Sequence, residues 1–331
     1  MAANDAEADP TELLIRARAG DGQAFGALIG PYRGELCLHA YRMLGSPDDA
    51  EDIVQDSLTR AWQSLSSYED RGTVRAWLYR IVTNRCLTVL DRASRRALPT
   101  DFSAEGFEEI HWLKPLPATH TAHLSAYDPE ARTAALETVE LAFLTAAHRL
   151  PPRQRAVLLL RDVLGFTAAE TAELLGMTVA AVNSALQRAK THQLNAPQAQ
   201  RVENTEVRLA AQRYAKAWEA GDVEAIISML AEDVRYSMPP LPHVFSGVRQ
   251  VRGFLHTGPL RHPGQAWLFL PASANGQLAF GTYMREATAP AYEPAGLDVL
   301  SFSSSAQITE VVSFLEADLT DFGLPQRLTA T

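Results

Sequence analysis

The stretch 162–190 constrains the fold more than any other part of this chain, because it holds the boundary signals of two short helices in close succession. Thr167 and Glu170 have the spacing of a capping box, which begins a helix. Gly176 suits the turn that follows, since glycine adopts positive φ without strain, and Thr178 can cap a second helix. The apolar positions expected to face inward on that second helix are Val179, Val182 and Leu186. This pattern predicts a helix-turn-helix.

The second helix of this pair has a polar outer face. The positions that project outward are Ala180, Ala181, Asn183, Ser184, Gln187 and Arg188, with Lys190 close behind. Asn, Gln and Arg side chains are suited to base edges in the major groove, and Arg and Lys reach phosphates. The pattern therefore favours DNA recognition over the alternative, an ordinary helical hairpin.

Arginine is concentrated in the segment 71–96. This segment carries seven arginines and one acid, Asp91, although the whole chain has 30 basic and 39 acidic residues and a net charge of −9. The residues that share one face of a helix here, with Asn84 beside them, are Arg85, Thr88, Arg92 and Arg95. Each phosphate contact would release counterions, so we expect salt-dependent DNA binding at this face. The alternative is a solvated basic helix.

An acidic helix precedes this arginine-rich segment. Ser46 can cap it, Pro47 suits its first position, and Asp49 stands where a capping-box acid belongs. Its apolar stripe is formed by Ala50, Ile53, Val54, Ala61, Trp62 and Leu65. Another face carries Asp52, Gln55, Asp56 and Thr59. That face is either solvated or docks on a basic partner surface.

The chain is predicted to be multidomain. Prolines interrupt 97–130, which we interpret as a linker, and 131–194 is again helical. A short second linker covers 195–203. From 204 to 331, two helices precede alternating β-branched and aromatic runs, an order typical of an α+β domain.

Composition excludes several classes of protein. Two cysteines, Cys37 and Cys86, are too few for a disulfide framework or a multi-cysteine metal site. His120 and His123 lack an evident third ligand, so we expect loop histidines, no metal and no cofactor. No apolar run approaches the ~20 residues that span a bilayer, and the N-terminus is too polar for a secretory signal. We therefore expect a cytoplasmic protein without a membrane partner.

Two segments resemble a known family. DAEDIVQDSLTRAW and the following VRAWLYRIVTNRCLTVLDRASRR resemble region two of the extracytoplasmic-function (ECF) sigma factors of bacterial RNA polymerase. LPPRQRAVLLLRDVLGFTAAETAELLGMTVAAVNSALQRAK resembles their region four, and the similarity covers about residues 10–192. The resemblance implies two all-α sigma domains, 1–96 and 131–194, that bind core RNA polymerase and direct transcription from promoter DNA.

The resemblance also implies a role for each face. The residues expected to bind core polymerase are Asp49, Asp52, Gln55 and Asp56. Those expected to read and melt the −10 element, with Asn84 and Arg85 near a flipped-out base, are Arg80, Asn84, Arg85, Thr88, Arg92 and Arg95. Those expected to read the −35 element in the major groove are Thr178, Ala180, Ala181, Asn183, Ser184, Gln187, Arg188 and Lys190.

The tail has a resemblance of its own. RYAKAWEAGDVEAIISMLAEDVRYSMPP is similar to the start of a SnoaL-like, nuclear-transport-factor-like cone domain. The segments 112–115 (WLKP) and 322–325 (FGLP) look like those of one ECF subgroup that carries such a tail. The resemblance implies an α+β cone closed by a helix of Val207, Ala211, Tyr214 and Trp218. The residues expected to line its cup are Tyr214, Trp218, Tyr236, Trp267, Phe280 and Tyr283.

The cone fold hosts isomerases, cyclases and ligand binders, so the fold alone decides no function. Proton transfer needs a carboxylate or histidine with a shifted pKa opposite an oxyanion donor. Asp222 and Asp233 are expected to cap helices, and the histidines without an acid partner at a recognisable spacing are His243, His256 and His262. We therefore predict no catalytic residue and a tail that regulates the sigma domains in cis, with or without a small ligand. The alternatives are a stand-alone helix-turn-helix regulator and a tail that is an isomerase or cyclase.

Overall fold

The structure is a computed structural model that describes residues 9–68, 73–96, 113–127, 129–193, 205–262 and 264–329. The chain divides into two compact units. The first contains residues 1–100 and 146–194, and the second contains residues 101–145 and 195–331. Within the described residues, none of the helices is both long and apolar enough to cross a membrane.

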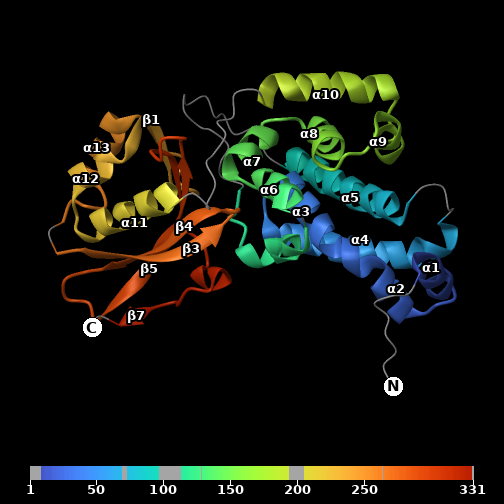
Figure 1. Ribbon diagram of the computed structural model, residues 1–331, viewed down its shortest axis with the longest axis horizontal. Helices are drawn as coiled ribbons and strands as arrows, with labels where there is room; N and C mark the ends of the chain where they lie inside the picture. Colours follow the sequence, from blue (N-terminus) through green and yellow to red (C-terminus); the bar gives the residue numbers. More distant parts are fainter. Residues whose placement is uncertain are drawn as a thin grey trace. The chain divides into compact units, whose positions relative to one another are not determined.

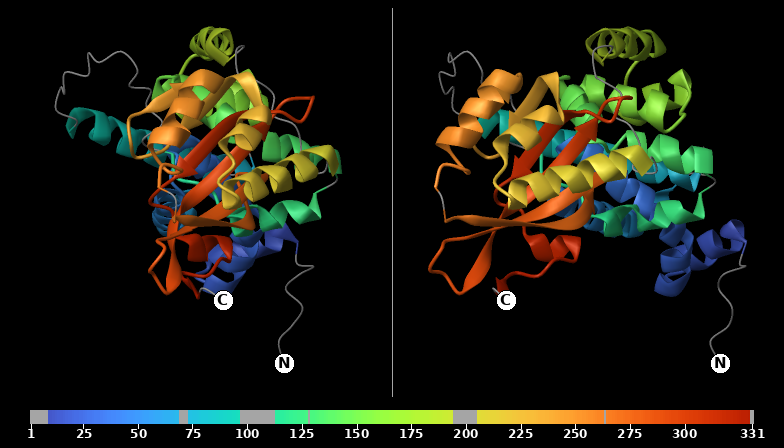
Figure 2. Two further views of the ribbon diagram at one scale, coloured as in Figure 1. Left: turned by 90° about the vertical axis from the view of Figure 1, so that its left-hand side faces the viewer. Right: turned by 60° about the vertical axis from the view of Figure 1, so that its left-hand side comes forward.

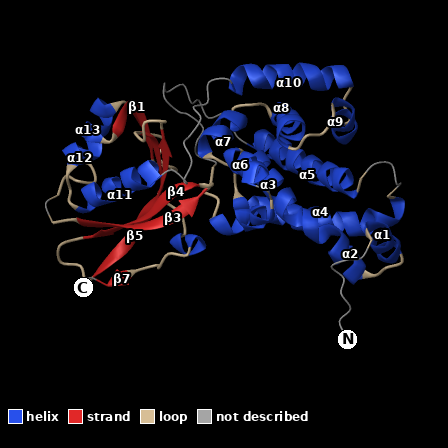
Figure 3. Ribbon diagram, viewed as in Figure 1, coloured by secondary structure: helices blue, strands red, loops and turns tan. Residues whose placement is uncertain are grey.

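The described secondary structure of the first unit is helical (Figure 3). Its α-helices are α1 (Pro10–Arg18), α2 (Gly22–Ile29), α3 (Arg33–Leu44), α4 (Pro47–Ser64), α5 (Val74–Arg96), α8 (Pro152–Leu158), α9 (Ala168–Leu175) and α10 (Val179–Gln193). Its short turns are η2 (Gly30–Tyr32), η3 (Leu65–Ser67) and the π-helical η6 (Leu159–Val163). Helix α7 (Leu141–His148) crosses the boundary between the two units.

Helix α4 begins where the sequence predicts. Gly45 ends α3 with a φ of 79°, a conformation that glycine adopts without strain. The Ser46 hydroxyl then accepts a hydrogen bond from the Asp49 N–H at 3.3 Å, and Pro47 occupies the first turn. The buried side of α4 is formed by Ala50, Ile53, Val54, Ser57, Leu58 and Ala61. The opposite side is therefore left for solvent or a partner.

The helix-turn-helix consists of α9 and α10. The Thr167 hydroxyl accepts a hydrogen bond from the Glu170 N–H at 3.2 Å, and the Glu170 carboxylate accepts one from the Thr167 N–H at 2.7 Å. Gly176 ends α9 with a φ of 61°, and Thr178 caps α10. The core side of α10 is formed by Val182, Ala185 and Ala189. Val179, which we expected to face inward, is 45% exposed because it lies in the first turn, before the packed stretch begins.

The second unit is built on a mixed seven-stranded sheet. Its strands are β1 (Leu230–Ser237), β2 (Val244–Ser246), β3 (Ala266–Ala274), β4 (Gln277–Arg285), β5 (Ala291–Phe302), β6 (Ile308–Phe314) and β7 (Leu328–Thr329). The order is β2-β1-β6-β5-β4-β3, and β7 pairs with β5. Strands β1 and β6 run parallel, and the other pairs are antiparallel. The α+β tail is thus confirmed.

Three helices accompany this sheet, namely α11 (Thr205–Glu219), α12 (Val223–Ser228) and α13 (Val248–Thr257), and η7 (Leu319–Phe322) lies near the C-terminus. Figures 1 and 2 show α11, drawn in yellow, lying across the strands. One apolar cluster joins these helices to the sheet. Its members include the five side chains that we call the cup: Tyr214, Trp218, Tyr236, Phe269 and Phe280.

The described residues from 113 to 145, which run from the predicted linker into the predicted second sigma domain and which we call the linker from here on, belong to the second unit. They contain η5 (Ala118–Ala126), α6 (Pro129–Glu137) and most of α7. We predicted that 131–145 belong with the helix-turn-helix, whereas these residues group with the tail in the structure. The reason is that helical periodicity predicts a helix but not its packing partner.

The turn between β3 and β4 binds this segment. Asn275 is buried at a φ of 56°, and its Oδ1 accepts a hydrogen bond from the Leu116 N–H at 2.9 Å. Its Nδ2 donates to the Val139 carbonyl at 2.8 Å. Gln277, also buried, accepts a hydrogen bond from the Leu141 N–H at 2.9 Å. Two side-chain amides therefore bond three backbone groups of the linker.

Candidate functional site

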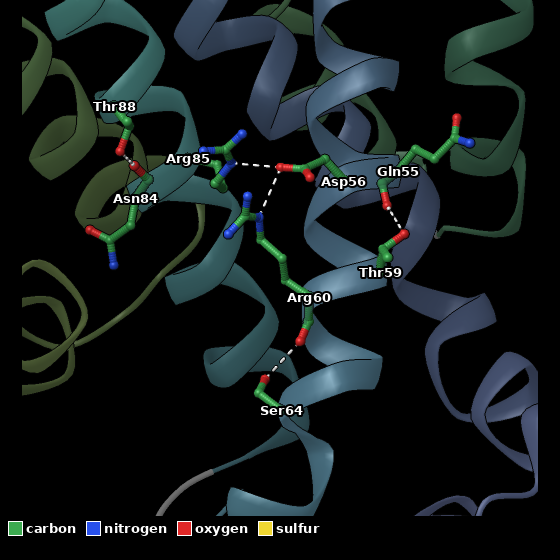
Figure 4. A network of polar contacts seen from close by, with 8 residues as sticks. All are labelled: Gln55, Asp56, Thr59, Arg60, Ser64, Asn84, Arg85 and Thr88. Atoms are coloured by element: carbon green, nitrogen blue, oxygen red, sulfur yellow. Dashed lines mark hydrogen bonds and ion pairs between the residues drawn. The ribbon is translucent and has the colours of Figure 1, made fainter.

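The acidic face of α4 contains one carboxylate that is already paired. Its exposed members are Asp49, Asp52 and Gln55. Asp56 accepts a hydrogen bond from Arg60 Nε at 3.0 Å and lies 2.7 Å from Arg85 Nε of α5 (Figure 4). Partial burial raises the pKa of Asp56, but the hydrogen bond from Arg60 and the charge of Arg85 lower it overall. Asp56 thus joins α4 to α5, whereas the other three face solvent.

The predicted −10 face on α5 is also partly engaged. The Asn84 side chain donates to the Leu174 carbonyl, in the last turn of α9, at 3.3 Å. The Thr88 hydroxyl donates to the Asn84 carbonyl at 2.7 Å, within α5 itself (Figure 4). Of the other members, Arg80 and Arg92 are exposed, Arg85 pairs with Asp56, and the Arg95 side chain lies outside the described residues. Asn84 is therefore bonded to the helix-turn-helix in this structure.

The predicted −35 face on α10 is open. The exposed members are Ala180, Asn183, Ser184, Gln187, Arg188 and Lys190, and Ala181 is half-buried. Thr178 is exposed as well, but its hydroxyl caps the helix by accepting a hydrogen bond from the Ala181 N–H at 3.1 Å. Lys190 forms an ion pair with Asp162 at 2.9 Å. The side chains suited to base edges thus project from a helix whose ends are fixed.

A buried guanidinium joins α3 to the helix-turn-helix domain. Arg155, on α8, is 5% exposed and donates to the carbonyls of Met43, Ala147 and His148. His148 Nε2 lies 3.1 Å from the Arg42 carbonyl, and its Nδ1 lies 3.1 Å from Arg155. Burial and the charge of Arg155 lower the pKa of His148 to about 3. The ring is therefore neutral, with Nε2 donating and Nδ1 accepting.

Aromatic contacts close the same interface. The Arg75 guanidinium of α5 lies over the ring of Tyr79 at 4.9 Å and over the ring of Phe166, just before α9, at 5.0 Å. Tyr79 and Phe166 meet edge to face at 5.4 Å, and Glu35 pairs with Arg75 at 3.2 Å. Helix α5, which carries the predicted −10 face, thus packs on α9.

Five of the six predicted cup residues lie together in the tail. Tyr214, Trp218, Tyr236 and Phe280 are buried in one cluster, and the half-buried Trp267 packs against it. Tyr283 does not line the cup, contrary to the prediction. It stands three residues from Phe280 on the same strand, so it points to the opposite face of the sheet, where its hydroxyl donates to the Pro325 carbonyl at 2.6 Å. The odd spacing between Phe280 and Tyr283 was the sequence signal that separates them.

One buried carboxyl group on the same sheet face as the cup was not predicted from the sequence. Asp298 on β5 is 2% exposed, and burial raises its pKa to about 7, opposed by a hydrogen bond with Ser313. It stands opposite Phe280 on β4 and Ser313 on β6, so it shares the face of the cup. The available signal was a single acid in the apolar run 297–300.

The two linker histidines lie on one short helix, and one of them packs against an aromatic ring. His120 and His123 belong to η5, and the ring of His123 meets the ring of Tyr127 edge to face at 6.4 Å. Within the part of the chain that the structure describes, no group of three or more His, Cys, Asp or Glu residues is placed to hold a metal ion.

Three family models match the chain. They are Sigma-70 region 2 over residues 28–96, Sigma-70 region 4 over residues 140–192, and the SnoaL-like domain over residues 211–311. Their order is that of the helical modules and the tail described above.

Two relatives and one solved structure extend this result. The ECF RNA polymerase sigma factor SigG of Mycobacterium tuberculosis is 39% identical, over 94% of this chain and 86% of that protein. SigJ of the same organism is 31% identical over 67% of each chain. The crystal structure of SigJ is similar in fold, with a TM-score of 0.59 and 24% identity over 88% of this chain and 97% of that one.

Proposed function

Because this chain belongs to the family of ECF RNA polymerase sigma factors and carries a fused SnoaL-like tail, we propose that it binds core RNA polymerase in the cytoplasm and directs it to particular promoters. The observation that carries the proposal is the pair of separately built helical surfaces, one on α4 and α5 and one on α10. The proposal includes no catalytic activity of the sigma domains.

Each surface has a distinct task in this proposal. Asp49, Asp52 and Gln55 on α4 dock on a basic surface of core polymerase. The −10 element is read by α5, with Asn84 as the side chain nearest an unpaired base. The −35 element is read in the major groove by α10, chiefly by the side chains that can bond base edges, namely Asn183, Gln187 and Arg188.

The contacts within the first unit imply a closed form. Asn84 is bonded to the carbonyl of Leu174, and Arg155 bridges α3 and α8. Reading two promoter elements at once requires α5 and α10 to face separate stretches of DNA. The proposed sequence of events is therefore that core polymerase and DNA replace these internal contacts and separate the two sigma domains.

The tail is proposed to regulate this step in cis. Asn275 and Gln277 bond the linker that must follow the sigma domains when they separate. Holding that linker on the tail limits how far it can extend. The contact thus gives the tail a direct mechanical influence on promoter spacing, whether or not a ligand is bound.

Run-off transcription with purified core polymerase tests the main proposal. The full chain should produce promoter-specific transcripts and be retained by core polymerase. Asp52→Arg should weaken that retention at least tenfold, because it places a cation against a basic surface. Glu12→Arg makes the same charge change on an exposed position of α1 and should behave as the native chain. If core polymerase ignores the full chain, the proposal fails.

A further inference from the structure

The stretch of the tail from residue 234 to residue 285 contains no acid. It carries five arginines and three histidines, although the whole chain has 39 acidic residues and a net charge of −9. Helix α13 lies within this stretch. Because the protein as a whole repels polyanions, a local excess of arginine is the kind of surface that can still attract one.

Helix α13 turns its arginines away from the body of the tail. Val251 and Leu255 are fully buried, and the ring of Phe254 stacks on the ring of Phe245 with centroids 4.5 Å apart. The other side presents an exposed row, three, four and seven residues apart and therefore on one helix face, that we call the α13 stripe: Arg249, Arg252, Gly253 and His256. The exposed Arg261 follows in the turn after the helix.

One acid competes for the stripe. Glu224 of α12 forms an ion pair with Arg252 at 3.1 Å, and both side chains are largely exposed. Exposed pairs of this kind contribute little to stability and are screened by salt, so a phosphate can take the place of Glu224. Arg249 and Arg261 form no ion pair with a described residue, and neither do the acids at 232–233 on β1, which packs against α13. The stripe therefore has cations available for a partner.

A glycine lies at the centre of the stripe although the fold does not require one. Glycine inside a helix is destabilising relative to alanine, and a fold needs it where φ is positive or where a neighbour leaves no room for a Cβ atom. Neither reason applies to Gly253, since its φ is not positive and a Cβ atom there would meet nothing within 4 Å. Glycine also allows another molecule to approach the backbone closely. Its position among the arginines therefore favours a partner that lies directly against α13.

The stripe suits a phosphate backbone better than a protein surface. Interfaces between proteins usually have an apolar core, whereas the exposed residues between and beside the arginines are Gln250, Gly253 and His256. From Arg249 to His256 the helix rises about 10 Å, and duplex DNA carries a negative charge about every 1.7 Å along its axis. Several phosphates can therefore lie along the stripe at once.

We propose that α13 is a third DNA-contacting surface of this chain, whose arginines bind the phosphates of duplex DNA without reading the bases. Arg249 and Arg261 contact phosphates directly, and Arg252 joins them when a phosphate replaces Glu224. On promoter DNA, the contact adds affinity outside the −10 and −35 elements, because the sigma domains already hold that DNA nearby. This last step rests on the proposed function, whereas binding to duplex DNA as such does not.

The test measures how the full chain binds a fluorescein-labelled duplex of random sequence, by anisotropy at a series of KCl concentrations. Arg249→Gln combined with Arg261→Gln should weaken binding about tenfold at low salt and make the plot of log K against log [KCl] less steep by about 2, since each phosphate contact contributes about 0.9 to the slope. The matched control, Arg213→Gln combined with Lys216→Gln, removes the same charge from exposed positions of α11 and should bind as the native chain does.

Two single variants test the parts of the stripe. Glu224→Gln releases Arg252 and should tighten binding about threefold. Its control, Glu12→Gln, removes an exposed carboxylate of α1 and should leave binding nearly unchanged. Gly253→Leu keeps every charge and favours the helix, so it should raise the melting temperature of the tail while it weakens DNA binding. A merely structural role of Gly253 would not give these opposite effects.

Cross-linking identifies the partner in the complex with core polymerase and promoter DNA. On irradiation, His256→p-benzoylphenylalanine should attach to DNA. Attachment to a polymerase subunit instead would mean that the stripe binds an acidic protein surface, and it would overturn the proposal. Equal salt slopes for the paired arginine variant and its control would overturn it as well, as would a native chain that fails to bind the duplex. Because duplex binding needs no polymerase, a chain that is inactive in run-off transcription can still pass this test, so the two proposals fail separately.

Discussion

At the scale of single residues, Arg155 has the most consequential position in the first unit. A guanidinium offers five N–H donors in a fixed fork, and here they bond carbonyls from the last turns of α3 and α7. These carbonyls lie at helix ends, where the backbone has no intrahelical partner. The single side chain thus satisfies the ends of two helices and joins the two sigma domains.

Replacing this side chain should destabilise the first unit. Arg155→Met keeps much of the buried volume but leaves the Met43, Ala147 and His148 carbonyls without their donor, so we expect a loss of about 2–4 kcal/mol in the free energy of unfolding. Urea unfolding followed by circular dichroism measures it. Arg153→Met changes an exposed arginine two residues away and serves as the matched control. Equal stability of the two variants would contradict the role given to Arg155.

At the scale of elements, features that depend on neighbouring residues could be predicted from the sequence, whereas packing between distant segments could not. The caps of α4 and α9 and the turn glycine Gly176 depend on residues within four positions of one another, so the sequence predicts them. The packing of α6 on the tail and the position of Asp298 depend on sheet register, which joins residues far apart in the chain. The faces of α4, α5 and α10 were predicted from periodicity and resemblance, whereas Tyr283 was assigned to the cup against the two-residue alternation of its own strand.

The β3–β4 turn provides a prediction about the linker. Asn275→Gly keeps a residue that tolerates a φ of 56° but removes both side-chain hydrogen bonds to the linker. Trypsin should therefore cut after the exposed Arg132 about tenfold faster, because less free energy is needed for local opening. Promoter-specific transcription should change at the same time.

The control for this variant is Ala306→Gly. Ala306 also has a left-handed φ, of 58°, in the turn between β5 and β6. Glycine there relieves the same backbone strain without touching the linker. If both variants are cut at the native rate, the turn does not hold the linker, and the proposed influence of the tail on the sigma domains loses its physical basis.

At the scale of the whole molecule, burial keeps titratable groups uncharged in both units, but it shifts their pKa values in opposite directions. In the first unit, burial lowers the pKa of His39 and of His148 to about 3. In the second, burial raises the pKa of Asp298 to about 7. A histidine held neutral in the fold lowers the free energy of unfolding as the pH falls below the pKa of that histidine in the unfolded chain. A carboxyl held neutral in the fold lowers it as the pH rises above the pKa of that carboxyl in the unfolded chain.

The two units should therefore respond to pH in opposite directions. When the pH is lowered from 7.5 to 5.5, the two histidines bind protons in the unfolded chain but not in the fold. The free energy of unfolding of the first unit should therefore fall by about 2–3 kcal/mol. Over the same interval, Asp298 binds a proton in the fold but stays ionised in the unfolded chain. The free energy of unfolding of the second unit should therefore rise by about 2 kcal/mol. Scanning calorimetry of the full chain should show two transitions that move apart or cross as the pH is lowered.

His148→Gln should reduce the shift of one transition, and Asp298→Asn should remove the shift of the other. Two transitions that move together would show that other groups govern the pH response, and the neutral state assigned to Asp298 would then be wrong.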